Sequence, residues 1–179
     1  KGKPIFSSQK EFTQYFPKSG WVEHNPEEIW NTTKKVLKDV ISKAKKLRGE
    51  VLAIGITNQR ETTVLWDKTN SKPIYNAIVW QCRRTSDICN KLIEKKYNDI
   101  FKSKTGLVID SYFSGTKINW ILNNVKNAKK ISKNGNLAFG TIDSWLIWNL
   151  TNSKNHVTDH TNASRTLIYN INDQKWDKE

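Results

Sequence analysis

The chain of 179 residues has no methionine, only two cysteines and no long apolar run. Cys82 and Cys89 form no CxxC pair, and two thiols are too few for a zinc site or a disulfide framework, which favours a reducing compartment. No apolar stretch approaches the roughly 20 residues that span a bilayer, and the first residues lack the apolar stretch of a signal peptide. These absences predict a soluble, cytoplasmic protein without membrane insertion.

The signatures of several enzyme classes are also missing. No GxSxG, HExxH or P-loop pattern occurs, and His24, His156 and His160 have no metal-ligand spacing with one another. The residues therefore give no support to a hydrolase or a metalloenzyme, and we predict no metal site.

Positive charge is abundant, with a formal net charge of +13, and there are 8 tryptophans. Clustered Lys and Arg bind nucleic acid by displacing counterions from phosphates, so a basic nucleic-acid-binding module is one alternative. The excess is mostly Lys, however, and it recurs on every predicted helix instead of forming one Arg-rich stripe. Solvated helix faces are the simpler explanation of the charge.

The hydrophobic pattern predicts an α/β fold with helices and short strands. Asn25, Pro26 and two glutamates begin a helix that should end near Gly49, and the apolar run VLAIGIT at 51–57 is typical of a strand buried on both faces. Further strands are predicted at 62–67, 74–80, 137–139 and 166–171, and further helices at 86–95, 116–125 and 143–150. The last residues, 176–179, resemble the opening of a helix, and both ends of the chain are expected to be truncated.

The sharpest local feature is the charged pair Arg60 and Glu61, which directly follows the predicted buried strand. Ligands bind at the carboxyl ends of strands in α/β sheets. Arg offers five donors and an ionised Glu only acceptors, so together they can bind a neutral polyol. A plain salt bridge between them is the alternative, and the pattern alone favours it.

Two aromatic residues are further candidates for a pocket. Trp80 ends an apolar run and is followed by polar residues, so its indole could wall a pocket beside the strand ends, although packing in the core is commoner. Tyr112 precedes a predicted helix, and its hydroxyl could reach a ligand against which its ring also packs; plain helix-entry packing is the alternative.

Six segments together closely resemble glycerol kinases, in the same order and spacing and over essentially the whole chain. They are GWVEH at 20–24, GITNQRET at 55–62, NAIVWQCRR at 76–84, TGLVID at 105–110, GTIDSWLIW at 140–148 and TDHTNASRT at 158–166. The wider sugar-kinase family usually has Asp where Cys82 stands, and xylulose kinases differ at Arg60 and Glu61. The resemblance therefore favours glycerol over a pentose.

The resemblance implies an actin-like (ribonuclease H-like) ATPase-type fold, a mixed sheet flanked by helices, with residues 1–179 forming an incomplete amino-terminal lobe of a two-lobed kinase. The residues that match Arg60, Glu61 and Tyr112 hydrogen-bond the glycerol hydroxyls in that family, and the match to Trp80 packs on the carbon backbone. The resemblance also implies ATP and Mg²⁺ as cofactors, and a homo-oligomer for the full-length enzyme.

The family's amino-terminal DQGTT phosphate loop and its catalytic Asp base have no counterpart in this chain. We therefore expect no catalytic residue and no cofactor-binding residue within it, and no kinase activity from the segment alone. A catalytically inactive polyol-binding homologue stays an alternative, because the decisive Asp would lie outside the chain.

Overall fold

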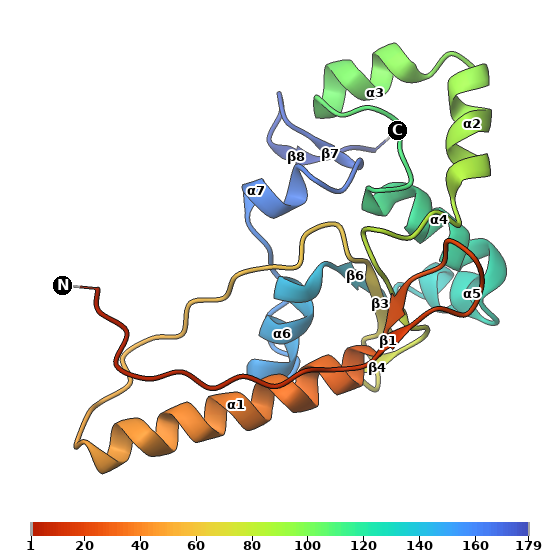
Figure 1. Cartoon of the computed structure of the whole chain (residues 1–179). Helices are drawn as coiled ribbons and strands as arrows, with labels where there is room; N and C mark the ends of the chain where they lie inside the picture. Colours follow the sequence, from red (N-terminus) through yellow and green to blue (C-terminus); the bar gives the residue numbers. More distant parts are fainter. Residues whose placement is uncertain (1, 179) are drawn as a thin grey trace.

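The computed structural model describes residues 2–178 and combines short strands with helices of moderate length (Figure 1). The strands are β1 Gln14–Tyr15, β2 Glu23–His24, β3 Val64–Asp67, β4 Lys72–Pro73, β5 Ala77–Ile78, β6 Leu137–Gly140, β7 Tyr169–Asn170 and β8 Lys175–Trp176. The helices are α1 Pro26–Lys46, α2 Ser86–Glu94, α3 Asn98–Thr105, α4 Ser114–Asn124, α5 Ala128–Lys133, α6 Ile142–Leu150 and α7 His160–Ala163. The predicted α/β class is confirmed.

The first helix, α1, begins where the sequence predicts. The side-chain oxygen of Asn25 accepts hydrogen bonds from the backbone N–H groups of Glu27 (2.9 Å) and Glu28 (3.4 Å), which satisfies two of the free donors at the helix start. Only the first turn is buried, with Ile29 at 5% exposure, whereas Leu47 at the other end is 64% exposed. The far end of α1 extends away from the central strands, with the amino-terminal segment running alongside the helix (Figure 1).

The strands within residues 2–178 form three small sheets, with orders β1-β2-β5, β4-β3-β6 and β7-β8, and every pair is antiparallel. The predicted strands at 62–67 and 137–139 are confirmed as β3 and β6, which pair from Val64 opposite Gly140 to Asp67 opposite Leu137. These two strands form the centre of the molecule.

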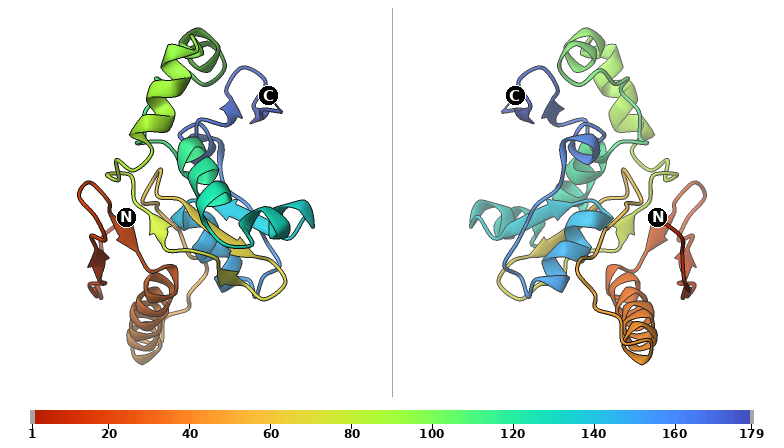
Figure 2. Two further views of the ribbon diagram at one scale, coloured as in Figure 1. Left: turned by 90° about the vertical axis from the view of Figure 1, so that its right-hand side faces the viewer. Right: turned by 90° about the vertical axis from the view of Figure 1, so that its left-hand side faces the viewer.

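Alternation along β3 sends its side chains into two cores, because successive residues of a strand point to opposite faces. Val64 and Trp66 pack with α6 on one face, against Trp145 and Trp148. Leu65 packs on the other face with Ile121 of α4 and further residues of that core. The two views in Figure 2 show α4 and α6 on opposite sides of β3 and β6. The predicted helices at 86–95, 116–125 and 143–150 are confirmed as α2, α4 and α6.

The predicted buried strand at 51–57 is wrong for this structure. The segment has no strand assignment, and Leu52 is 86% and Ile54 50% exposed. It runs from the far end of α1 back to β3 as an extended stretch (Figure 1). The physical reason is that a strand buried on both faces needs partners, and none of the strands within residues 2–178 pairs with it.

Smaller differences occur near the other strands. The predicted strands at 74–80 and 166–171 shorten to β5 and β7, because the residues around them form turns and loops. Residues 175 and 176 form β8, paired with β7, so the predicted helix opening at 176–179 is wrong for the described residues; residue 179 lies outside them.

The exposed run at 51–57 predicts association of the isolated chain, since extended, exposed apolar segments tend to pair with other copies. We expect Leu52→Lys and Ile54→Lys together to lower the average mass of the isolated chain at high concentration, measured by light scattering. The matched control is Ile5→Lys, because Ile5 is 79% exposed but lies outside the run. This change should leave the average mass unchanged. Equal masses for all three proteins would contradict the prediction.

Candidate functional site

Glu61 lies in a tight turn just before β3, and the surrounding side chains hold its backbone in an unusual conformation. Its φ is +60°, in the left-handed region that non-glycine residues rarely adopt, and the residue is only 2% exposed. Its carbonyl oxygen accepts from Nζ of Lys117 (2.9 Å), from Oγ1 of Thr63 (3.1 Å) and from Oγ of Ser114 (3.4 Å). Three side chains thus hold the Glu61 carbonyl while its backbone adopts a conformation that non-glycine residues rarely adopt.

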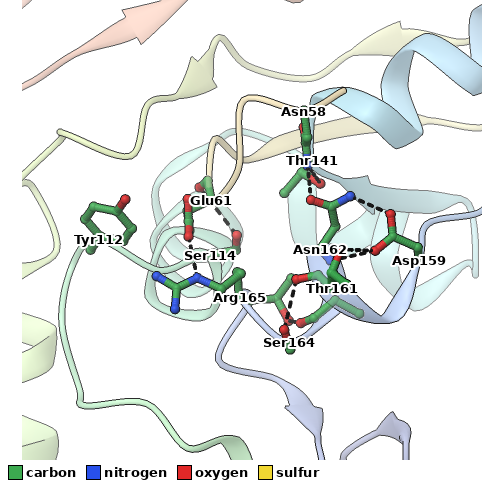
Figure 3. A network of polar contacts seen from close by, with 12 residues as sticks. Asn58, Glu61, Tyr112, Ser114, Thr141, Asp159, Thr161, Asn162, Ser164 and Arg165 are labelled. Carbon is green, nitrogen blue, oxygen red and sulfur yellow. Dashed lines mark hydrogen bonds and ion pairs between the residues drawn. The ribbon is translucent and has the colours of Figure 1, made fainter. Parts of the chain in front are cut away.

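The carboxylate of Glu61 pairs with Arg165, a residue that the sequence reasoning missed. Nε of Arg165 donates to Oε1 of Glu61 at 2.7 Å, and the guanidinium lies on the same side as Tyr112 (Figure 3). Arg60 is exposed and makes no ion pair with any residue in 2–178, so the open alternative of a plain Arg60–Glu61 salt bridge does not form. Within that range no donor bonds to Oε2 of Glu61, which leaves this oxygen available to a ligand.

Tyr112 and Trp80 form the aromatic side of the same site. Their ring centroids lie 5.4 Å apart, and Cζ of Arg165 lies 6.0 Å from the Tyr112 ring. The backbone N–H of Tyr112 donates to Oδ1 of Asp110 at 2.7 Å, which fixes the start of the turn before α4. Both aromatic rings are half-buried, and the Tyr112 hydroxyl has no hydrogen bond to another residue of the described chain. The structure therefore brings Glu61, Tyr112 and Trp80 to one site, and Arg60 adjoins it in the chain.

A polar network ties the turn at Glu61 to the segment that carries Arg165 (Figure 3). Nδ2 of Asn58 donates to Oγ1 of Thr141 (2.9 Å) and to Oδ1 of Asn162 (2.8 Å), and its Oδ1 accepts from the N–H of Asp143 (3.1 Å). Asn58 precedes the turn, Thr141 precedes α6, and Asn162 belongs to α7. One side-chain amide thus joins three segments that are distant in sequence.

Two carboxylates complete this network. Asp143, at 4% exposure, accepts from the hydroxyls of Thr141 and Thr158, and it lies in the first turn of α6, where negative charge is favourable. Asp159 caps α7 by accepting from the N–H of Asn162 at 2.9 Å. A hydrogen bond from the hydroxyl of Thr161 is the largest cause that holds the pKa of Asp159 below its usual value, and the N–H of Asn162 is the next largest. The segment leading to Arg165 is therefore fixed at its start.

A second ion pair, with both side chains buried, joins β2 to the segment after β5. Nη2 of Arg84 is 2.7 Å from Oε1 of Glu23, and the two side chains are 0% and 3% exposed. The Arg84 guanidinium also stacks on Trp21, with Cζ 3.9 Å from the ring centroid. Burial alone raises the pKa of Glu23, but hydrogen bonds from Asn76, Tyr75 and Arg84 outweigh burial and hold it below its usual value.

The part of the chain that the structure describes holds no group of three His, Cys, Asp or Glu side chains that could bind a metal ion. Within the same residues, no helix is both long enough and apolar enough to cross a bilayer.

The family model for the amino-terminal domain of the FGGY family of carbohydrate kinases matches residues 1–179. The chain belongs to the FGGY family. Among curated relatives, this FGGY chain is 59% identical over 179 residues to a glycerol kinase of Bacillus cereus (strain G9842), and 60% identical over 178 residues to a glycerol kinase of Bacillus velezensis. These alignments cover 100% and 99% of the chain but only 36% of each relative, so the chain spans about a third of their length.

Solved structures of FGGY kinases confirm the fold. The FGGY chain superposes on Plasmodium falciparum glycerol kinase with ADP at a TM-score of 0.91 and 38% identity, covering 98% of this chain and 35% of that one. It superposes on gluconate kinase from Lactobacillus acidophilus at a TM-score of 0.85 and 24% identity, covering 99% and 34%. The second similarity shows the shared fold alone.

Proposed function

We propose that the protein of which this chain forms part is a cytoplasmic, ATP-dependent glycerol kinase, and that the chain supplies half of the glycerol pocket through Arg60, Glu61, Trp80 and Tyr112. The observation that carries the proposal is the 59% identity to a Bacillus glycerol kinase along the entire chain. Such an enzyme transfers the γ-phosphoryl group of ATP, with Mg²⁺, to a terminal hydroxyl and forms sn-glycerol 3-phosphate.

The chemistry of the site supports this proposal. Glycerol is neutral and has little apolar area, so directional hydrogen bonds must supply its specificity, and those with charged partners are the strongest. Oε2 of Glu61 is an available acceptor, the Tyr112 hydroxyl an available donor or acceptor, and the exposed Arg60 an available donor. The half-buried indole of Trp80 adds an apolar wall that excludes water.

In this proposal the chain positions the substrate and does not carry out the chemistry. Phosphoryl transfer depends mainly on positioning and on charge stabilisation. The phosphate loop and the catalytic base would come from elsewhere in the protein, and the site would be complete only when two lobes close. A homo-oligomer of the full-length enzyme is part of the same proposal.

The test is a coupled ADP-release assay on the full-length protein with glycerol, gluconate and xylulose as acceptors. We expect the highest kcat/KM for glycerol, and no turnover from the chain of residues 1–179 alone. Glycerol binding by calorimetry without turnover would instead indicate the inactive polyol-binding homologue. Neither binding nor turnover of glycerol by the full-length protein would overturn the proposal.

A further inference from the structure

Lys117, on α4, is a lysine with no solvent exposure. Lysine is among the residues least often buried, because its ammonium loses hydration that only good hydrogen bonds can replace. Among the described residues, no carboxylate lies within ion-pair distance of its Nζ. The burial of Lys117 therefore requires an explanation other than a salt bridge.

The hydrogen bonds of Lys117 provide that explanation. Nζ donates to the backbone carbonyl of Glu61 at 2.9 Å and to the backbone carbonyl of Tyr112 at 2.6 Å. These two residues come from segments far apart in the sequence, one before β3 and the other before α4. A single side chain thus connects the backbones of two residues that face the candidate site.

We propose that Lys117 is a positioning residue for polyol binding, which sets the spacing between Glu61 and Tyr112 from behind the site. The inference rests on the proposed function. The Glu61 backbone needs such support because its φ of +60° is unfavourable for a non-glycine residue. The remaining donors to its carbonyl, Thr63 and Ser114, are at 3.1 and 3.4 Å, and neither of them donates a hydrogen bond to the Tyr112 carbonyl. Only Lys117 connects both carbonyls among the described residues.

The protonation of Lys117 is consistent with this geometry. Burial is the main reason that the pKa of Lys117 is lowered to about 7. The charge of Arg84 lowers this pKa further, whereas Cys82, Glu61 and Asp110 act to raise it. A neutral amine still carries two N–H donors, which match the two carbonyl acceptors. The connection therefore persists on both sides of neutral pH.

The lowered pKa also has a predictable effect on stability. Between about pH 7 and the usual value of 10.5, the unfolded chain binds a proton at Lys117 that the folded chain does not. Stability contributed by this site therefore rises with pH across that window. Lys117→Met should remove this part of the pH dependence of the unfolding midpoint, compared with the wild-type protein under the same conditions.

The decisive experiment measures glycerol binding by calorimetry, and steady-state kinetics, on full-length wild type and on Lys117→Met. The Met side chain keeps the approximate volume of Lys but removes both donors. We expect the Kd and KM for glycerol to rise about 10- to 100-fold, because small misplacements of binding groups have effects of that size. The KM for ATP should stay within about twofold of wild type.

Ile121→Ala is the matched control, because Ile121 is fully buried on the same helix but lies in the hydrophobic core. It should lower the thermal midpoint while leaving glycerol affinity within about twofold of wild type. If the Met variant does not fold, Lys117→Leu, which also lacks a donor, replaces it, and the same comparison decides.

The outcomes separate the two proposals. If wild type does not bind glycerol, the proposed function fails. If wild type binds glycerol and a folded Lys117 variant binds it equally well, the positioning role is overturned while the proposed function stands.

Discussion

We expect Arg84→Met to be strongly destabilising, with a loss of about 3–5 kcal/mol in the free energy of unfolding. Arg84 pairs with Glu23 at 2.7 Å with both side chains buried, and removing the cation leaves a buried carboxylate without its charged partner. The same change also removes the guanidinium that stacks on Trp21. The measurement is urea unfolding of the full-length protein, followed by tryptophan fluorescence.

The neighbouring arginine is a matched control for this prediction. Arg83 pairs with Asp110 at 2.8 Å, but its side chain is 57% exposed, so Arg83→Met should cost only about 0–1 kcal/mol. The double variant Glu23→Gln with Arg84→Met should be less destabilised than the sum of the single changes, because it leaves no isolated charge. A cost of under about 1 kcal/mol for Arg84→Met would show that the pair contributes little.

The pair also predicts a response to acid. Because the folded-state pKa of Glu23 is lowered, its contribution is complete above its unfolded value of 4.5 and is lost as the pH falls through the folded value. Acid unfolding of wild type should therefore contain a component that Glu23→Gln removes.

The sequence correctly predicted the helices and strands that depend mainly on neighbouring residues. Asn25 and Pro26 mark a helix start that needs no distant partner, and β3 follows from an apolar run that lies between turn residues. The run at 51–57 carries the same kind of signal, yet it is extended and exposed, because a strand exists only where another strand pairs with it. An apolar run shows what a segment can bury and does not identify the strands that will pair with it.

The candidate site shows the same limit. Arg60, Glu61, Trp80 and Tyr112 are predicted as site residues from their local sequence contexts and from the resemblance, whereas no such signal points to Arg165 or Lys117. The ion pair of Glu61 with Arg165 and its bond with Lys117 depend on tertiary contacts between distant segments. Arg165 lies in the segment at 158–166 that resembles glycerol kinases, but the resemblance did not indicate what this arginine does.

On the proposed function, Arg60→Ala and Glu61→Gln in the full-length protein should each lower kcat/KM for glycerol by about 10- to 150-fold. This range corresponds to the roughly 1.5–3 kcal/mol that a hydrogen bond to a charged group contributes. Arg60 is exposed and makes no ion pair among residues 2–178, so its removal should barely change the thermal midpoint. Glu61→Gln keeps the shape of the side chain but weakens the bond from Arg165, so it should lower both the midpoint and glycerol affinity.

Arg48→Ala and Glu94→Gln are the matched controls, because both residues are exposed and lie outside the candidate site. Both controls should keep kcat/KM for glycerol within about twofold of wild type. The KM for ATP should be nearly unchanged in all four variants, since no residue of this chain is assigned to the nucleotide. If Arg60 had only a structural role near the surface, Arg60→Ala would cost about 0–1 kcal/mol of stability and leave glycerol kinetics unchanged. Glycerol values within twofold of wild type in both site variants would therefore remove Arg60 and Glu61 from the pocket.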